Sequence, residues 1–447
     1  MINKFKPISI SLSPNVQKDD VRLALKLLFQ PGKWKEGSAI KELEESFRKY
    51  LGVNPVRNSP PTGPSGAQSA GEISNGVKYA VSFNSGRSAL FAILKALNLP
   101  LGSNVSLQAF TCNAVPNPIL WAGLNPVYID CKDDFNIDPE KVTGEIVIIQ
   151  HTFGLPANIE NIMSRLQRNQ GSLINSENLS GRQTNTVIIE DCAHALGAEV
   201  NSQKVGTFGK AGFFSFSRDK VISSVYGGMA VTNDDAIGKR LEELQKEFGM
   251  PGMFWIKQQI LHPILLHYII LPMYNFLDLG KIFLILSQSL HVLSKAVSWQ
   301  EKRGLRPDYF PKALPNAMAM MALHQFNKLE KFNSHRKELA DFYYQELQNT
   351  SFVLPKKENN IFLRFAVQHP KAHEIIYEAW HKENMLLGDW YTSAIAPDDT
   401  KMEEMKYEAG MCPNAERLAK QTLNLPTHIN ISKEEAQRIV NFLKKYK

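Results

Sequence analysis

Four short, continuous apolar runs constrain the fold of this chain more than any other feature. They are NVSLQAF, NPVYID, GEIVIIQ and NTVIIED, and stretches of helical or turn composition such as NAVPNPILWAGL and ANIENIMSRLQ separate them. Strands that are apolar throughout, rather than at alternate positions, are buried on both faces. Strands that alternate with helices form parallel sheets. The sequence therefore predicts an α/β fold with a mostly parallel sheet flanked by helices.

Composition divides the chain into three parts. Residues 1–250 contain the apolar runs and are predicted to form a large domain. Within it, inserts near 54–76 and 168–185 are polar and nearly free of large apolar side chains, so we expect surface loops there. Residues 312–447 are predicted to form a long helix followed by a smaller C-terminal α+β domain.

The remaining part, 251–311, is predicted to be an apolar helical insertion. It contains QQILHPILLHYIILPMYNFL and KIFLILSQSLHVL, which are dense in Ile, Leu and Phe. Three interpretations stay open: buried helices or a subunit interface, a hairpin lying on a membrane surface, and a membrane span. Pro263 and Pro272 interrupt the first run, and His262 and His267 dilute it, which argues most strongly against a span.

Charge and cysteine content limit the partners of the chain. Its 447 residues carry a net charge of +7 with a pI near 9.0, but no Lys/Arg-rich block and no nucleic-acid-binding signature. A phosphate-bearing substrate or an anionic surface therefore accounts for the basic charge as well as nucleic acid does. The four cysteines lack C-x-x-C spacing, which argues against a disulfide framework or a metal site and fits a reducing compartment. No secretory signal is recognised, so we expect a cytoplasmic protein.

The first candidate site element is the run Asn84-Ser85-Gly86-Arg87-Ser88, between a strand pattern and a helix pattern. Gly86 permits a close backbone approach, and a helix N-terminus offers free N–H groups and a positive dipole end. Arg87 and Ser88 could add a cation and a hydroxyl to such a phosphate cradle. An ordinary helix start capped by serine is the alternative explanation.

Further candidates lie at the ends of predicted strands. Asp191 and His194 follow the run TVII, where a partly desolvated carboxylate can keep a pyridine nitrogen protonated. Lys220 follows the Phe-rich run FFSFSRD, and a partly buried amine there could act as a nucleophile. Phe110 or Cys112 could lie against an aromatic cofactor. A loop salt bridge, a solvated surface lysine and core packing are the respective alternatives.

The order and spacing of these elements resemble one family. Stretches such as KYAVSFNSGRSALFAIL, VIIEDCAHALGAEVNSQKVGTFGKAGFFSFSRDK, GGMAVTND and CPNAERLAKQTLNLPTH are similar to the DegT/DnrJ/EryC1/StrS aminotransferases. These are fold-type I enzymes that use pyridoxal 5'-phosphate (PLP) and mostly make amino sugars on nucleotide carriers. The resemblance covers most of the chain, except the two polar inserts and the apolar segment.

The resemblance implies a role for each candidate. Lys220 would be the catalytic residue, which links covalently to the cofactor and then moves the proton between cofactor and substrate. Asp191 would pair with the pyridine nitrogen, and His194 would contact the phenolic oxygen. Cys112 falls where an aromatic residue often stacks on the ring. The cofactor phosphate would be held by Gly86, Arg87, Ser88 and Ser215.

The implied reaction is amino transfer, with glutamate as the expected donor, to a keto-sugar on a nucleotide or lipid-linked carrier. The family also implies a homodimer with a shared active site, and Asn316 is a weak candidate for the residue donated by the partner. The family's usual Pro-Thr-Lys-Asn run is replaced here by Arg218-Asp219-Lys220-Val221. Two alternatives keep the fold: a PLP-dependent sugar dehydratase, and a non-catalytic regulator whose apolar segment binds a membrane or a partner. The presence of Lys220 argues against the dehydratase, and the retention of Lys220, Asp191 and His194 together argues against the regulator.

Overall fold

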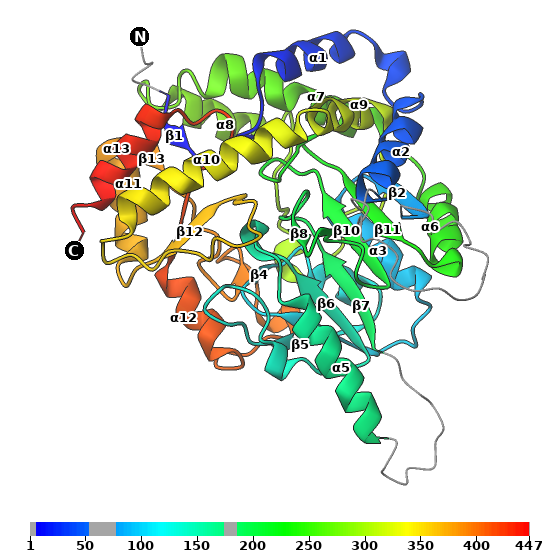
Figure 1. Ribbon diagram of the computed structural model, residues 1–447. Coiled ribbons are helices and arrows are strands. Elements are labelled where there is room, and N and C mark those ends of the chain that lie inside the picture. The colour runs from blue at the N-terminus through cyan, green and yellow to red at the C-terminus, as the bar shows by residue number, and fades with distance from the viewer. Residues whose placement is uncertain (1–5, 53–76, 174–185, 447) are drawn as a thin grey trace, which may run out of the picture.

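The computed structural model describes residues 6–52, 77–173 and 186–446, and a seven-stranded sheet lies at its centre (Figure 1). Its strands are β2 (Tyr79–Phe83), β3 (Asn104–Gln108), β5 (Asn125–Ile129), β6 (Ile146–Gln150), β7 (Val187–Asp191), β10 (Ala211–Ser215) and β11 (Gly228–Thr232). Their order is β2-β11-β10-β7-β6-β3-β5. All neighbours pair in parallel except β11, which is antiparallel to β10 and β2. The predicted α/β fold with a mostly parallel sheet is confirmed.

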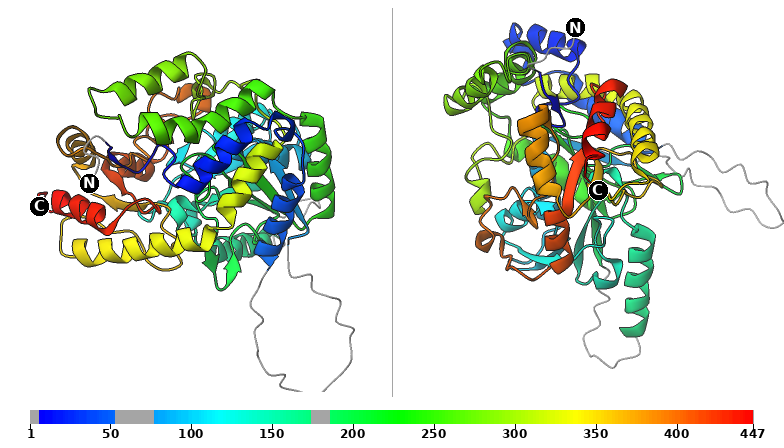
Figure 2. Two further views of the ribbon diagram at one scale, coloured as in Figure 1. Left: turned by 90° about the horizontal axis from the view of Figure 1, so that it is seen from above. Right: turned by 90° about the vertical axis from the view of Figure 1, so that its left-hand side faces the viewer.

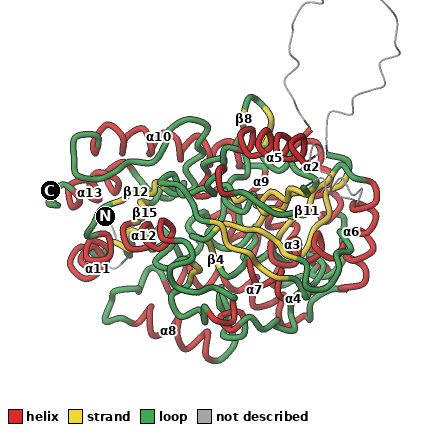
Figure 3. Tube along the Cα trace, turned by 90° about the horizontal axis from the view of Figure 1, so that it is seen from below, coloured by secondary structure: helices red, strands yellow, loops and turns green. Residues whose placement is uncertain are grey.

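Helices cover both faces of this sheet, as the layers in Figure 3 show. One face is covered by α3 (Gly86–Ala96), α4 (Pro116–Trp121) and α6 (Asp235–Phe248). Much of the other is covered by α1 (Lys18–Leu28), α2 (Ala39–Gly52), α7 (Met253–Leu265) and α9 (Asn316–Phe326). Consecutive strand residues point to opposite faces, so Phe213 packs on the α3 side and Phe214 on the α2 side. Both faces are therefore apolar, which explains the continuous apolar runs.

Of the two polar inserts, only the beginning of the second lies within the described residues. Helix α5 (Ile159–Leu173) extends into the second insert. The loop is predicted to begin near 168, so the structure differs from that prediction up to Leu173. The remainder of that insert, 174–185, and the first insert lie outside the described residues.

The C-terminal part packs its own core around a small sheet. Strand β12 (Phe365–Gln368) pairs with β15 (Thr422–Leu425). Strand β1 (Ile8–Ser9) joins this part by pairing with β13 (Met385–Leu386), so the N-terminal strand lies near the C-terminus (Figure 1). The helices are α10 (Leu329–Leu347), α11 (Ala372–Glu383), α12 (Pro413–Gln421) and α13 (Lys433–Leu443). The predicted long helix is two helices, because α9 ends at Phe326 and α10 begins at Leu329.

Two short strand pairs complete the fold. Strand β4 (Thr111–Cys112) pairs with β14 (Ile395–Ala396) and so ties the large sheet's region to the C-terminal part. Strands β8 (Glu199–Val200) and β9 (Gln203–Lys204) form a hairpin.

The apolar segment divides into a buried and an exposed helix. Helix α7 packs against α1 and α9 and contributes Ile256 and Ile260 to the core. A π-helical turn (Leu266–Ile270) leads to α8 (Leu279–Ser289), which lies at the rim of the molecule (Figures 2 and 3). In the part of the chain that the structure describes, no helix is long and apolar enough to cross a membrane.

Candidate active site

A cavity of ≈ 520 Å³ lies at the carboxyl ends of the central strands. Gln150, Asp191 and Ser215 are the last residues of β6, β7 and β10, and all three line it. Ligands of such sheets bind at this edge. Seven of the eight predicted site residues also line the cavity: Gly86, Arg87, Cys112, Asp191, His194, Ser215 and Lys220.

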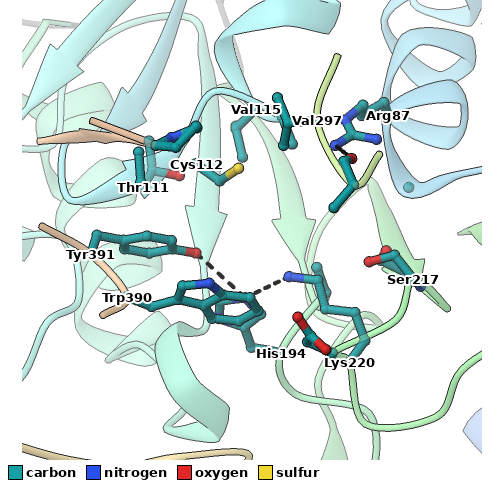
Figure 4. A pocket seen from close by; sticks show the side chains of 18 of the residues that line it. Arg87, Thr111, Cys112, Val115, His194, Ser217, Lys220, Val297, Trp390 and Tyr391 are labelled. Atoms are coloured by element: carbon teal, nitrogen blue, oxygen red, sulfur yellow. Dashed lines mark hydrogen bonds between the residues drawn. The ribbon is translucent and has the colours of Figure 1, made fainter. Parts of the chain in front are cut away.

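Lys220 is held as a half-buried amine next to His194. Its Nζ lies 2.7 Å from His194 Nε2 and 4.6 Å from the centroid of the Trp390 ring (Figure 4). Burial lowers the pKa of Lys220 from 10.5 to about 8, against the opposing pull of nearby Asp191. The alternative of a solvated surface lysine is thus not what the structure shows.

The hydrogen-bond network around His194 indicates how the lysine is charged. Burial, with the Lys220 and Arg364 cations, lowers the pKa of His194 well below its usual value, so the ring is neutral. The backbone N–H of Phe153 donates to Nδ1 at 3.2 Å, which assigns the single ring proton to Nε2. The Nε2–H group then donates to the Lys220 amine, which accepts with its lone pair. This arrangement fits the uncharged, nucleophilic form of the amine, which becomes the major form above a pH of about 8.

Asp191 reaches the cavity from the end of β7. One carboxylate oxygen, Oδ1, accepts the backbone N–H of Ala193 at 2.9 Å, and the side chain is buried. Burial raises the pKa of Asp191, which the Ala193 hydrogen bond and the Lys220 cation oppose. The preceding residue, Glu190, points the other way and accepts the backbone N–H groups of the loop at Gly206, Phe208 and Gly209. The alternation of the strand thus leaves Asp191 as the carboxylate of the cavity.

The turn before α3 is built for a close backbone approach. A Cβ on Gly86 would lie 3.0 Å from Ser215 Cβ, and one on Gly228 would lie 2.4 Å from the Ser85 carbonyl oxygen. Ser85 caps α3 by accepting the Ser88 N–H at 3.0 Å. Ser88 is fully buried, and its hydroxyl donates to Asn84 Oδ1 at 2.7 Å. The structure therefore does not place Ser88 in the cavity, and its local role is inside the helix start.

Arg87 faces a segment that sequence reasoning missed, 294–301. Its Nε lies 2.7 Å from Glu301 Oε1, and its guanidinium donates to the Ala296 carbonyl at 3.0 Å (Figure 4). Burial alone would lower the pKa of Arg87, but the Glu301 carboxylate outweighs it and the pKa is raised. Arg218 is tied to the same segment through the Ser294 carbonyl and hydroxyl. The end of the cavity at the predicted phosphate turn is therefore lined in part by Ala296 and Val297 of the same chain.

The aromatic wall of the cavity comes from the C-terminal part. The His194 ring lies between Phe153 and Trp390, with centroids 6.0 Å and 5.2 Å away and interplanar angles of 6° and 14°. The Tyr391 hydroxyl lies 3.5 Å from His194 Nε2. Arg364 stacks on Trp390 at 3.5 Å. Cys112, at the position where the family often has an aromatic residue, is half-buried and lines the cavity apart from this aromatic wall (Figure 4).

Asn316, the weak candidate for donation to a partner subunit, is committed within its own chain. Its Oδ1 accepts the Ala39 N–H at 3.2 Å, and its Nδ2 donates to the Lys33 carbonyl at 2.8 Å. The amide thus ties the start of α9 to the start of α2.

Comparison with known proteins agrees with this geometry. The model of the DegT/DnrJ/EryC1/StrS aminotransferase family matches residues 72–262 and 298–444, which contain every predicted site residue. The chain belongs to this family. Over 385 residues it is 26% identical to a UDP-N-acetyl-3-dehydro-alpha-D-glucosamine 3-aminotransferase of Acidithiobacillus ferrooxidans, covering 83% of this chain and 85% of that protein.

Solved structures confirm the fold of this family member. PseC of Helicobacter pylori, an aminotransferase of pseudoaminic acid biosynthesis, matches with a TM-score of 0.69 and 20% identity over 98% of this chain and 99% of that one. The sugar aminotransferase Spr1654 of Streptococcus pneumoniae matches in its PMP form with a TM-score of 0.69 and 18% identity, covering 99% of this chain and 96% of that one. Its PLP form matches with a TM-score of 0.67. The predicted resemblance, the fold class and the assignment as an aminotransferase are confirmed.

Proposed function

We propose that this aminotransferase uses PLP to move an amino group from glutamate to a keto-sugar on a nucleotide carrier, for amino-sugar or cell-surface polysaccharide synthesis. One observation carries the proposal: the half-buried amine of Lys220, whose pKa is lowered to about 8, shares a cavity with the strand-end carboxylate of Asp191. The cavity residues suit a phosphorylated pyridine aldehyde, because they offer an amine, an acid and a glycine-lined helix N-terminus.

When bound, the cofactor supplies an electron sink for the carbon that loses or gains a proton. Lys220 would accept that proton and return it, because its amine lies in the cavity and its pKa of about 8 is near a neutral working pH. Asp191 would keep the ring nitrogen protonated. The N–H groups at Gly86 and Arg87 would hold the phosphate, with Ser215 beside them.

The support for a keto-sugar acceptor comes from relatives. The named relatives act on a UDP-linked 3-dehydro sugar or belong to pseudoaminic acid synthesis. Besides Arg87, the cavity is lined by a second arginine, Arg218, next to Ser217. A nucleotide or a lipid diphosphate carrier would place phosphate groups at such a cation.

The deciding experiment incubates the purified protein with glutamate and a panel of keto-sugar nucleotides, followed by mass spectrometry. We expect an amino sugar together with 2-oxoglutarate in equal amounts. A deoxygenated sugar without 2-oxoglutarate would indicate the dehydratase, and a protein that binds no PLP would indicate the regulator. Either result overturns the proposal.

We further propose a cytoplasmic homodimer, as the family resemblance implies. The four cysteines are free, which fits a reducing compartment. Light scattering coupled to size exclusion tests the assembly, since a chain of 50.4 kDa that stays monomeric while fully active would contradict a shared active site.

A further inference from the structure

Helix α8 presents an apolar stripe to the outside of the molecule. Leu279, Ile282, Leu286 and Leu290 recur at helical spacing and are 40%, 48%, 53% and 71% exposed, and Ile285 beside them is 62% exposed. A helix on the surface of a globular protein normally turns polar residues outward. This stripe therefore needs a partner that the rest of the described chain does not supply.

The helix is nevertheless fixed to the body of the protein. Phe283 and Leu284 pack on a small core formed by Leu266, Ile270 and Leu293. Gly280 fits against the backbone, because a Cβ there would lie 2.3 Å from the Ile270 carbonyl oxygen. The outward stripe is thus a property of a docked helix.

This helix is also an addition to the family fold. The family match is interrupted between 262 and 298, and the interruption contains the π-helical turn and all of α8. The common aminotransferase scaffold therefore does not require the stripe.

The charges that follow α8 along the chain favour an anionic surface. Within α8 and the turn before it, Asp278 and Lys281 pair with each other at 2.8 Å. Beyond the helix, Lys295, Arg303 and Arg306 are exposed, and no carboxylate pairs with them among the described residues. Trp299, 59% exposed, lies under the Arg303 guanidinium, an amphipathic pair typical of membrane interfaces.

We propose that α8 lies on a lipid bilayer that carries anionic headgroups, with its stripe in the boundary between headgroups and acyl chains. Leu277, 79% exposed, extends the stripe at the start of the helix.

Helix α8 is connected to the cavity through the segment that follows it. Ala296 and Val297 line the cavity, and the chain connects them to the end of α8 at Ser289. If the proposed amino transfer is correct, a lipid-linked sugar could reach the site from the membrane. The docking itself does not depend on the chemistry.

The test is flotation of the full-length holoenzyme with vesicles of phosphatidylcholine alone or mixed with phosphatidylglycerol. We expect flotation with the mixed vesicles. Combined Ile282→Ser, Ile285→Ser and Leu286→Ser substitutions should lower the bound fraction by at least about 100-fold, because three apolar side chains no longer enter the boundary. Leu101→Ser, at a residue 83% exposed elsewhere, is the matched control and should float as the wild type does.

A second variant tests the charges. Combined Lys295→Gln, Arg303→Gln and Arg306→Gln substitutions should remove the preference for phosphatidylglycerol, at about fivefold per cation. A wild type that floats with neither vesicle overturns the proposal. A stripe variant that floats as the wild type does also overturns the proposal. A stripe variant whose only change is a smaller assembly on size exclusion overturns it too, because that result would assign the stripe to a second copy of the chain. Amino transfer to a soluble sugar nucleotide should persist in the stripe variant, which separates this proposal from the proposed function.

Discussion

The buried pair of Arg87 and Glu301 should be a strong stability determinant. Their side chains are 10% and 0% exposed, and the Nε–Oε1 distance is 2.7 Å. Glu301→Gln keeps the shape but leaves the Arg87 cation without its counter-charge. Removal of one partner of a buried pair costs about 3–5 kcal/mol.

This cost can be converted into a melting temperature. Unfolding entropy is about 2.1 cal/mol/K per residue, so a chain of this length has about 0.9 kcal/mol/K. Glu301→Gln should therefore lower Tm by about 3–5 °C, measured by calorimetry on the apoprotein. Lys302→Gln, next in sequence, removes an exposed pair with Asp399 and should shift Tm by less than about 1 °C.

A double-substitution cycle then isolates the pair. Arg87→Met with Glu301→Leu replaces both charges by apolar groups, and should recover most of the stability that either single change loses. Additive losses in the double variant would refute the reasoning, as would a Tm for Glu301→Gln equal to that of Lys302→Gln. Either result would mean that the pair is not held as the structure shows.

Three further predictions concern the cavity. The rate at which the apoprotein captures PLP should rise with pH through about 8 and fall tenfold per pH unit below it, because the neutral Lys220 amine is the nucleophile. Stopped-flow absorbance measures this rate, and a midpoint near 10.5 would contradict the prediction. Gly228→Ala should destabilise the protein and weaken PLP binding in an equilibrium titration, since its Cβ would lie 2.4 Å from the Ser85 carbonyl oxygen, whereas Gly32→Ala, with nothing within 4 Å, should be tolerated. Asp191→Asn should retain PLP but lower the turnover in a coupled glutamate assay by about 100-fold or more, and an unchanged turnover would remove Asp191 from its role.

The sheet and the strand-end residues were predictable because their signals are local. Continuous apolar runs fix buried strands, and a carboxylate or amine directly after such a run must lie at the ligand-binding edge. That rule marked Asp191 as a candidate, and Lys220 lies five residues after the end of β10. The family resemblance, rather than the local signal, gave both residues their roles. The antiparallel direction of β11 was not predictable in this way, since GMAVT has the same composition whichever way it pairs.

The residues that sequence reasoning missed reach the cavity through long-range packing. Trp390 and Tyr391 come from a loop of the C-terminal part, and Glu301 from the end of the apolar segment. No spacing rule relates them to Lys220. An aromatic pair in a polar stretch, DWYTS, was the one available signal for the first two. Ser88 shows the converse, because a serine at a helix start bonds inward as readily as outward.

The most direct test of the account is to find the lysine that carries the cofactor. Purified protein would be reduced with borohydride in the presence of PLP, digested and analysed by mass spectrometry. The account predicts the cofactor adduct on the peptide that contains Lys220, and loss of both the adduct and the visible absorbance in Lys220→Ala. An adduct on another lysine, or its persistence in Lys220→Ala, would contradict the assignment of this cavity as the active site.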